Sequence, residues 1–224
     1  RNGKYYLTFP WAKDSTEVLA YCMADQPLGP WKFMGVFMDE SPTGCWTNHH
    51  SIVEYKGQWY IFYHHNDYSP EFDKNRSARI DTIGFNPDGT IIKVIPTLRG
   101  VGNSDARTQI QIDRYSEIAP TASIAYLNED NKFDGWKTLF KKSGAWVRYN
   151  RVEFGQEPVK QVKFRVLAPK GAKLEVSIAG GKSIATVNVP RSNNWEIVSA
   201  PVKKSPAGLQ DLKITLKSGQ SEVD

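Results

Sequence analysis

The sequence has little cysteine, no long apolar run and no segment with helical periodicity. Its two cysteines, Cys22 and Cys45, are too few for a disulfide framework or a four-thiolate zinc site, and we expect both to be small buried residues. No apolar run approaches the roughly 18–20 residues of a membrane-spanning helix, which excludes an integral membrane protein of that kind. The missing 3.6-residue period predicts that the chain has no substantial helix.

The chain also lacks an initiator methionine and a signal peptide, since it opens at Arg1. Asn2 and Gly3 form a typical hairpin-turn pair, yet no strand precedes them. We therefore expect that residue 1 is not the natural start of the protein. On that expectation, the missing signal gives no information about the cellular compartment.

Aromatic residues, in contrast, are abundant: the 224 residues include 7 Trp, 10 Tyr and 10 Phe. Together with frequent Gly and Pro and the lack of helical pattern, this composition favours an all-β protein and is common among sugar-binding proteins. The 40 % apolar content can build a sizeable core, which excludes a disordered chain.

Positive charge is concentrated in the second half. Residues 1–102 hold 10 Lys and Arg against 11 Asp and Glu, whereas residues 103–224 hold 19 against 13. This asymmetry indicates two units. A basic half would also suit a nucleic-acid binder. Its lysines alternate with apolar residues in the run Val159–Val166, however, as on the solvated face of a strand, and we favour that interpretation.

An internal repeat occupies the first hundred residues. The segment Arg1–Phe9 is echoed by Tyr55–Tyr63, and each copy has a glycine turn, an aromatic pair and an apolar strand. Multi-strand repeats of about 40–50 residues are typical of β-propeller blades. Two copies are too few to close a propeller, because each blade buries its faces against its neighbours. Residues 1–100 are therefore predicted to be part of a propeller, either as a fragment of one or as one component of an assembly.

The pattern changes after residue 100. Residues 101–109 lie in a turn-rich stretch and are predicted to be a linker. Short runs with period-two alternation then recur over residues 110–224, separated by Gly, Pro and Asn. Their spacing of about 8–14 residues predicts an antiparallel β-sandwich of the jelly-roll type.

Three motifs in the first half resemble glycoside hydrolase family 43, whose members are five-bladed propeller enzymes acting on plant polysaccharides. The motifs are the segment Trp46–His64, the opening Arg1–Thr8, and Asn75–Ser77, which is similar to a late arginine motif of the family. The likeness covers residues 1–98. It implies that this chain holds the last blades and that the N-terminal blades are missing from it.

The second half resembles carbohydrate-binding module family 6, a β-sandwich often attached to such enzymes. The resemblance rests on Ser143–Gly155 and is supported by Asn193–Trp195 and Gly208–Leu212. The final Glu222–Asp224 is similar to the start of the module's closing strand. We therefore expect residues 110–224 to form a module that lacks its last strand.

The first resemblance implies inverting glycoside hydrolysis, which needs a carboxylic acid and a carboxylate about 6.5–9.5 Å apart. In the family, these groups and a third carboxylate that tunes the acid all precede a segment like Arg1–Gly3. We therefore expect the catalytic carboxylates upstream of residue 1, none in this chain, and no activity from the chain alone. The carboxylates of the first half are interpreted as solvated surface charges: Glu17, Glu54, Asp67, Glu71, Asp73 and Asp81.

His49 is the candidate metal-site residue. In the family, a histidine at the matching position points to the propeller axis, where many members hold calcium through water. Since calcium prefers oxygen ligands, His49 would bind or orient a water molecule; the alternative is a hydrogen-bonded core histidine. Its neighbour His50 points to the opposite strand face and cannot ligate the same ion. Either His64 or His65 could line the pocket floor, whereas neither a zinc site nor an organic cofactor is implied.

Four residues are candidates for sugar contacts. Arg76 matches an arginine near the family's acid and substrate, where a guanidinium can bind hydroxyls or a carboxylate; the alternative is an ordinary surface arginine. Trp46 either offers a stacking platform for a pentose or packs in the core. In the sandwich, Trp195 matches one aromatic of the module's loop cleft and Phe140 falls near the other. Glu222 replaces the usual Asn, so we expect weak sugar binding or none.

The combined prediction is part of a secreted or periplasmic enzyme that cleaves α-L-arabinofuranosides or β-xylosides in xylan- or arabinan-type polysaccharides. On this main prediction, we expect the enzyme to bind neither nucleic acid nor a membrane. The alternative is a non-catalytic carbohydrate-binding or scaffolding protein in which the sandwich is the working part. A third hypothesis, nucleic-acid binding, rests on the basic second half alone.

Overall fold

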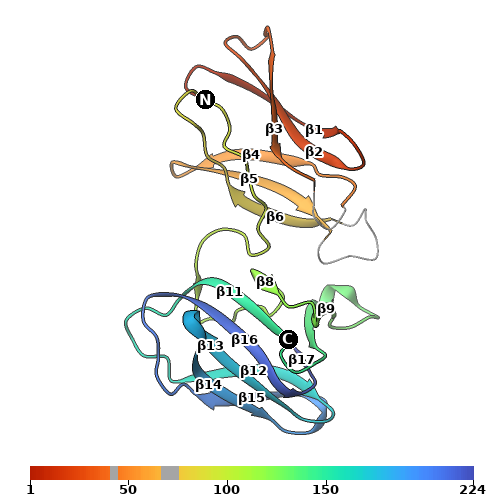
Figure 1. Ribbon diagram of the computed structural model, residues 1–224, viewed down its shortest axis with the longest axis vertical. Helices are drawn as coiled ribbons and strands as arrows, with labels where there is room; N and C mark the ends of the chain where they lie inside the picture. The colour runs from red at the N-terminus through yellow and green to blue at the C-terminus, as the bar shows by residue number, and fades with distance from the viewer. Residues whose placement is uncertain (41–44, 67–75) are drawn as a thin grey trace. The chain divides into compact units, whose positions relative to one another are not determined.

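The computed structural model describes residues 1–40, 45–66 and 76–224. The chain divides into two compact units, Arg1–Val101 and Gly102–Asp224, which are described separately (Figure 1).

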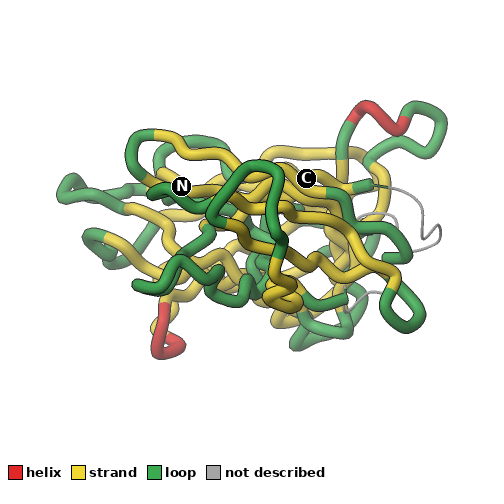
Figure 2. The backbone as a smooth tube through the Cα atoms, turned by 90° about the horizontal axis from the view of Figure 1, so that it is seen from above, coloured by secondary structure: helices red, strands yellow, loops and turns green. Residues whose placement is uncertain are grey.

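Both units consist almost entirely of strands, so the all-β prediction is confirmed. Among the described residues, helix is limited to two single 3₁₀ turns, η1 (Lys132–Asp134) and η2 (Ala179–Gly181), coloured red in Figure 2. None of these residues belongs to a helix long and apolar enough to cross a membrane.

The first unit contains two three-stranded antiparallel meanders, with strand orders β1-β2-β3 and β4-β5-β6. The strands are β1 (Tyr5–Ala12), β2 (Glu17–Ala24), β3 (Lys32–Met38), β4 (His50–Tyr55), β5 (Gln58–His65) and β6 (Ser77–Thr82).

The two glycine turns of the sequence repeat lie at equivalent places, directly before β1 and β5. Asn2 and Gly3, before β1, have φ angles of 47° and 74°, while Lys56 and Gly57, between β4 and β5, have φ angles of 51° and 78°. Positive φ at two successive residues matches a type I′ hairpin turn, a geometry that glycine adopts without steric cost. The turn at Lys56 and Gly57 joins β4 directly to β5.

One apolar core joins the two meanders. Its buried members are Leu19, Tyr21, Phe37, Met38, Ile61, Tyr63, Ile83, Ile91 and Val94. The Oη atom of Tyr21 accepts a hydrogen bond of 3.0 Å from the backbone N–H of Ile91, which ties the segment after β6 to β2. Packing of the two repeats against each other agrees with neighbouring blades, whereas the closed propeller ring stays a prediction.

The second unit is a sandwich of two sheets, with orders β15-β12-β17-β10-β9 and β14-β13-β16-β11-β7; β8 also pairs with β11. The strands are β7 (Ser104–Asp105), β8 (Glu117–Ile118), β9 (Ala122–Tyr126), β10 (Trp136–Phe140), β11 (Trp146–Glu153), β12 (Gln161–Ala168), β13 (Ala172–Ile178), β14 (Lys182–Val189), β15 (Ser192–Pro201), β16 (Leu209–Gly219) and β17 (Ser221–Val223).

Strand β12 shows the period-two alternation that the sequence predicted. Phe164, Val166 and Ala168 are buried between the sheets, whereas Lys163 and Arg165 are exposed on the outer face. Because successive side chains of a strand point to opposite faces, this pattern fixes which face of the sheet meets the core.

The predicted linker over residues 101–109 is wrong as a free connector. Strand β7 pairs in parallel with β11, and the guanidinium of Arg107 donates to the carbonyl oxygens of Phe154 and Glu157. The second unit therefore begins at Gly102, well before residue 110. The pairing was not foreseen because it joins residues about fifty positions apart.

Candidate functional site

Two histidines from neighbouring strands of the first unit contact each other. The backbone N–H of His49, just before β4, donates a 3.1 Å hydrogen bond to Nε2 of His64 in β5. Their rings meet edge to face with centroids 5.6 Å apart. His64 is only 8 % exposed, whereas the side chain of His49 is 55 % exposed. The pair thus offers one buried and one accessible imidazole.

His64 is held in its neutral form. Burial lowers its pKa to about 4, and the positive charge of Arg76 and the neighbouring His49 and His65 act in the same direction, against an opposing effect of Glu17. Since Nε2 already accepts from His49, the remaining proton must lie on Nδ1. Nδ1 has no hydrogen-bond partner among the described residues. It is therefore a buried donor that the described residues leave without an acceptor.

Glu17 and Asn48 fix the backbone beside this pair. The Oε2 atom of Glu17, at the start of β2, accepts a 2.8 Å hydrogen bond from the N–H of Asn48 and lies 3.9 Å from Nε2 of His49. Asn48 is fully buried, and its Oδ1 has no hydrogen-bond partner within the described part of the chain. No sequence pattern singles out this contact, because it joins residues 31 positions apart.

The adjacent histidines point elsewhere, as strand alternation predicted. The ring of His50 packs against Phe37 at 5.6 Å, and burial lowers its pKa. His65 is buried with its ring 5.0 Å from that of Tyr63. His50 and His65 therefore belong to the core of the first unit, and His64 is the one that meets His49.

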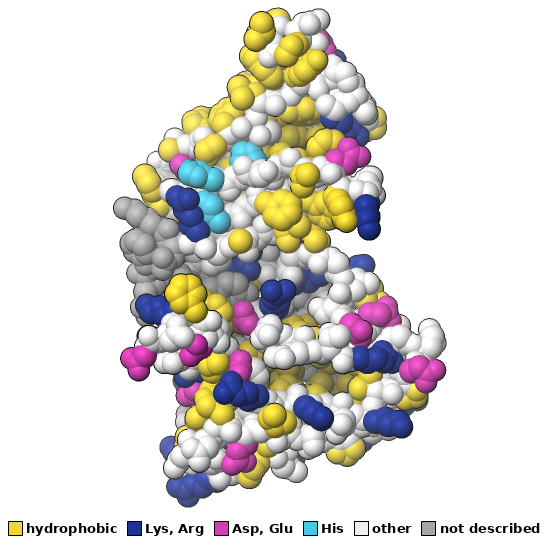
Figure 3. Space-filling view, turned by 180° about the vertical axis from the view of Figure 1, so that it is seen from behind, with side chains coloured by type: hydrophobic (Ala, Val, Ile, Leu, Met, Phe, Trp, Pro, Cys, Tyr) yellow, Lys and Arg dark blue, Asp and Glu magenta, His cyan; other side chains and the backbone are white. Residues whose placement is uncertain are grey.

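Arg76 and Trp46 both belong to this side of the first unit. Arg76 is exposed immediately before β6, and its charge acts on His64. Trp46 is 51 % exposed, which excludes the core-packing alternative, and its carbonyl oxygen accepts a 3.1 Å hydrogen bond from the N–H of Glu17. Figure 3 shows histidine side chains, in cyan, reaching the surface of this unit close to a dark-blue basic residue.

The residues around His49 do not by themselves form a calcium site. Calcium takes six to eight oxygen ligands. Close to His49 the structure places the carboxylate of Glu17 and the unpaired Oδ1 of Asn48. Within the described residues, no three His, Cys, Asp or Glu side chains converge as a metal-binding group. The metal role of His49 therefore stays a prediction.

Two carboxylates predicted to be solvated surface charges are not. Asp81 is only 7 % exposed and accepts hydrogen bonds from Oη of Tyr63 at 2.6 Å and from the N–H of Thr97 at 2.9 Å. Glu17 is also largely buried, at 20 % side-chain exposure. The prediction was wrong because both carboxylates accept hydrogen bonds from residues that are distant in sequence. Such donors allow a carboxylate to lie on the inner face of a strand. Glu54 is exposed as expected. The other three lie outside the described residues: Asp67, Glu71 and Asp73.

Trp195, the candidate sugar platform of the sandwich, has one ring face covered. The guanidinium of Arg165 lies 4.8 Å from its ring centroid and is itself paired with the carboxylate of Asp224. A sugar could therefore stack on at most the other face of the indole. The cation–π contact joins β12 to β15 and could not be foreseen from sequence spacing.

Phe140 cannot be the opposing aromatic, because it is 1 % exposed and part of the core. Its neighbour Leu139 takes the alternate side of β10 and stands directly across from Glu222. The carboxylate of Glu222 is ion-paired with Lys137 at 2.9 Å. The resemblance indicated the correct strand. The residue on its outward face is Leu139, one position before Phe140, and its side chain is aliphatic.

Comparison with family models matches both units. Residues 1–91 match the model of Glycosyl hydrolases family 43, and residues 103–224 match that of Carbohydrate binding module (family 6). The second match alone covers more than half of the chain.

Individual curated relatives match part of the chain. This chain is 41 % identical over 92 residues to a "Beta-xylosidase" of Xylanibacter ruminicola, a match that covers 40 % of this chain and 27 % of the relative. A "Xylosidase/arabinosidase" of Bacteroides ovatus is 40 % identical over 95 residues, covering 42 % of this chain and 27 % of the relative. The matched region thus spans about a quarter of these curated relatives.

A solved structure supports the fold over the whole chain. A family 43 arabinoxylan arabinofuranohydrolase from Bacillus subtilis, determined with cellotetraose, has a TM-score of 0.65 at 22 % identity, covering 100 % of this chain and 51 % of that chain. At this identity the likeness supports the fold alone. The chain therefore belongs to carbohydrate-binding module family 6 through its second unit, and its first unit matches the model of glycoside hydrolase family 43.

Proposed function

We propose that the protein to which this chain belongs hydrolyses α-L-arabinofuranoside or β-xyloside linkages of hemicellulose, with inversion of configuration. The observation that carries the proposal is the 41 % identity over 92 residues to a β-xylosidase, beside a similar identity to a xylosidase/arabinosidase. The site supports it, because the guanidinium of Arg76 and the neutral imidazole of His64 are groups that bind sugar hydroxyls.

In this proposal the chain supplies part of the active-site wall rather than the acid and base. An inverting mechanism needs two carboxyl groups that are free to exchange protons with substrate and water. Asp81 is saturated by donors from Tyr63 and Thr97, and Glu17 is bound by the N–H of Asn48. The catalytic carboxylates are therefore expected from the part of the protein that corresponds to the unmatched length of the relatives.

The roles of the chain's own residues follow from their geometry. His64 would donate its Nδ1–H to a substrate oxygen or a catalytic carboxylate, and its low pKa keeps it neutral at working pH. Arg76 would hold a hydroxyl or carboxylate through two parallel N–H donors. Trp46 would offer an apolar ring face to the C–H groups of a pentose.

The test uses aryl xylosides and aryl arabinofuranosides with a longer protein that contains this chain. Arg76→Ala should lower kcat/KM by about 10- to 100-fold, since each lost charged hydrogen bond is worth roughly 1.5–3 kcal/mol. Lys93→Ala, which removes an exposed cation paired with Asp39, is the matched control and should have no such effect. The 224-residue chain alone should be inactive. Turnover by that chain, abolished by a substitution within residues 1–98, would contradict the proposal.

Calcium enters the proposal only through His49. His49 would orient a water ligand of the ion, with most oxygen ligands coming from outside the described residues. We expect calcium to raise the Tm of the longer protein and His49→Ala to reduce that rise. If calcium leaves the Tm of both proteins unchanged, the metal role is wrong.

The alternative function, carbohydrate binding without catalysis, depends on the second unit. We expect its loop cleft to bind sugar weakly, since Trp195 has one face covered, Leu139 cannot stack, and Glu222 is ion-paired. Calorimetry of the chain with xylo- and arabino-oligosaccharides tests this. Micromolar binding that Trp195→Ala abolishes would favour the alternative.

We also propose a secreted or periplasmic location, because a polysaccharide substrate is too large to enter a cell intact. Fractionation of cells that express the longer protein tests this, and recovery in the cytoplasm alone would contradict it.

A further inference from the structure

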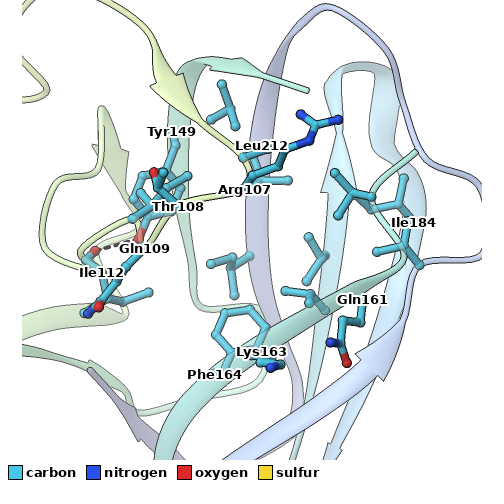
Figure 4. Close-up of a pocket in the computed structure, with 18 of the residues that line it drawn as sticks. Arg107, Thr108, Gln109, Ile112, Tyr149, Gln161, Lys163, Phe164, Ile184 and Leu212 are labelled. Atoms are coloured by element: carbon cyan, nitrogen blue, oxygen red, sulfur yellow. Dashed lines mark hydrogen bonds between the residues drawn. The ribbon is translucent and has the colours of Figure 1, made fainter. Parts of the chain in front are cut away.

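The second unit contains a cavity of about 770 Å³ between its two sheets, lined by apolar side chains such as those of Tyr149, Phe164 and Ile184 (Figure 4). Asp224 also lines it, directly after β17, the strand that pairs with β12. The closing strand of the module is expected to continue from Glu222–Asp224 and would occupy this space. The fold itself therefore accounts for the cavity, without a separate ligand.

In the first unit, Glu17 holds the segment of residues 45–49 at two points. Its backbone N–H donates a 3.1 Å hydrogen bond to the carbonyl oxygen of Trp46, and its Oε2 atom accepts a 2.8 Å bond from the N–H of Asn48. The side chain of Glu17 is largely buried, so water has little access to the second bond. A carboxylate is also a stronger acceptor of a backbone N–H than a neutral oxygen. One residue therefore fixes the backbone on both sides of Thr47.

The segment depends on such bonds because it has no regular strand of its own. Residues 45–49 all precede the ladder that pairs β4 with β5. Cys45 and Asn48 are fully buried, whereas Trp46 and the side chain of His49 are half exposed. The buried residues anchor the segment, and the exposed ones are presented to an incoming molecule.

The two exposed residues are held differently. The backbone N–H of His49 donates to Nε2 of His64, so the position of His49 has a support that does not involve Glu17. The carbonyl oxygen of Trp46, in contrast, is bound by Glu17 itself. The orientation of Trp46 should therefore respond to a change at Glu17 more strongly than that of His49.

We propose that Glu17 is a positioning residue that holds the indole of Trp46 where a pentose ring can stack on it. This role rests on the proposed function, in which Trp46 contacts the substrate. Stacking needs a ring face in a fixed orientation, and a platform that is held in advance loses less conformational freedom when the sugar binds. Because the role needs only an acceptor, a glutamine amide should serve in place of the carboxylate, which separates this role from that of a catalytic acid or base.

The first test follows Trp46 in the 224-residue chain without substrate. Fluorine NMR with fluorotryptophan reports on each of the seven Trp, and Trp46→Phe identifies the resonance of Trp46. Glu17→Ala should shift or broaden this resonance and remove the hydrogen-exchange protection of the Asn48 amide, whereas Glu17→Gln should preserve both. Glu17→Asp, which retracts the carboxylate by one methylene, replaces the alanine variant if that variant does not fold.

The control for a general loss of stability is Thr97→Val, which removes a hydroxyl that donates to the buried carboxylate of Asp81 in the same unit. It should leave the Trp46 resonance unchanged. An unmoved resonance in Glu17→Ala, or an equal change in Thr97→Val, would overturn the proposal.

The second test uses aryl xylosides and aryl arabinofuranosides with the longer protein. Glu17→Ala should raise KM about three- to tenfold, as expected for one aromatic contact, with kcat changed less than about twofold. Adding Glu17→Ala to Trp46→Ala should raise KM little further, because two residues that act through one contact are not additive. Fully additive effects would contradict the proposal.

Glu17→Gln should keep the kinetic constants of the unchanged protein. A kcat lower by about 100-fold would instead make Glu17 a catalytic carboxylate and would also overturn the proposal. If the longer protein hydrolyses neither substrate, the proposed function fails, while the fluorine resonance still decides whether Glu17 holds Trp46.

Discussion

The buried carboxylate of Asp81 accepts three hydrogen bonds in the first unit. Thr97→Val measures how much one of them contributes to stability. The hydroxyl of Thr97 donates a 2.5 Å hydrogen bond to Oδ1 of Asp81, beside the bonds from the Thr97 N–H and from Tyr63. Valine keeps the shape and the backbone donor and removes only the hydroxyl. A hydrogen bond to a charged group contributes roughly 1.5–3 kcal/mol, so the free energy of unfolding of this unit should fall by about that amount.

The control is Thr90→Val, which removes a 2.7 Å bond donated to the exposed carboxylate of Asp88 and a 2.9 Å bond accepted from the exposed side chain of Asn86. Because solvent replaces both bonds, we expect a loss below about 1 kcal/mol. A domain of about 100 residues loses roughly 4–8 °C in Tm per kcal/mol, so calorimetry separates the two variants. Hydrogen exchange assigns the transition to the first unit, since a two-unit chain need not unfold in one step. Equal losses for the two variants would refute the anchoring argument.

Three further predictions concern the site and the sandwich. The pKa of His64 is about 4 when folded and 6.5 when unfolded, so the unfolded state binds more protons between these values. The contribution of His64 to stability should be fully present above pH 6.5. As the pH drops towards 4, the free energy of unfolding should fall by up to about 3 kcal/mol. In urea unfolding at several pH values, His64→Gln should show a weaker dependence on pH. Glu17→Ala should destabilise the first unit by about 1–3 kcal/mol and Glu17→Gln by less, since glutamine still accepts from Asn48. Phe140→Ala should cost about 3–5 kcal/mol in thermal unfolding, whereas Trp195→Ala should cost clearly less and act on sugar binding instead.

Features determined by neighbouring residues were predictable from the sequence. Asn2 and Gly3, and again the turn at Gly57, carry the positive φ values that a two-residue turn requires, which is why the repeat could be recognised. The alternation in the run Val159–Val166 likewise predicted a strand close to the observed bounds of β12, Gln161–Ala168. In both cases the information lies within a few residues of chain.

Features that depend on distant partners were not predictable. Strand β10 was not expected from the sequence, so nothing indicated that Phe140 faces the core and Leu139 the outside. Alternation shows which residues share a face, but the choice of the buried face depends on the sheet that packs there. Asp81 was misjudged for the same reason, because its donor Thr97 lies 16 residues away in a segment without regular structure.

The strongest structural mark of the candidate site is its set of unpaired polar atoms. Buried side-chain atoms without a hydrogen-bond partner among the described residues include those of Thr16, Thr47, Asn48, His50 and His64. They come from three short stretches that the bonds of Glu17 to Asn48 and of His49 to His64 bring together. Each such atom costs roughly 1–3 kcal/mol, and folded proteins contain few of them. Asp81, in the same unit, is fully satisfied. The unpaired atoms around His49 and His64 therefore lower the free energy of unfolding of the first unit. Such a cost is expected at a site where a substrate, an ion or a further protein segment completes the hydrogen bonds.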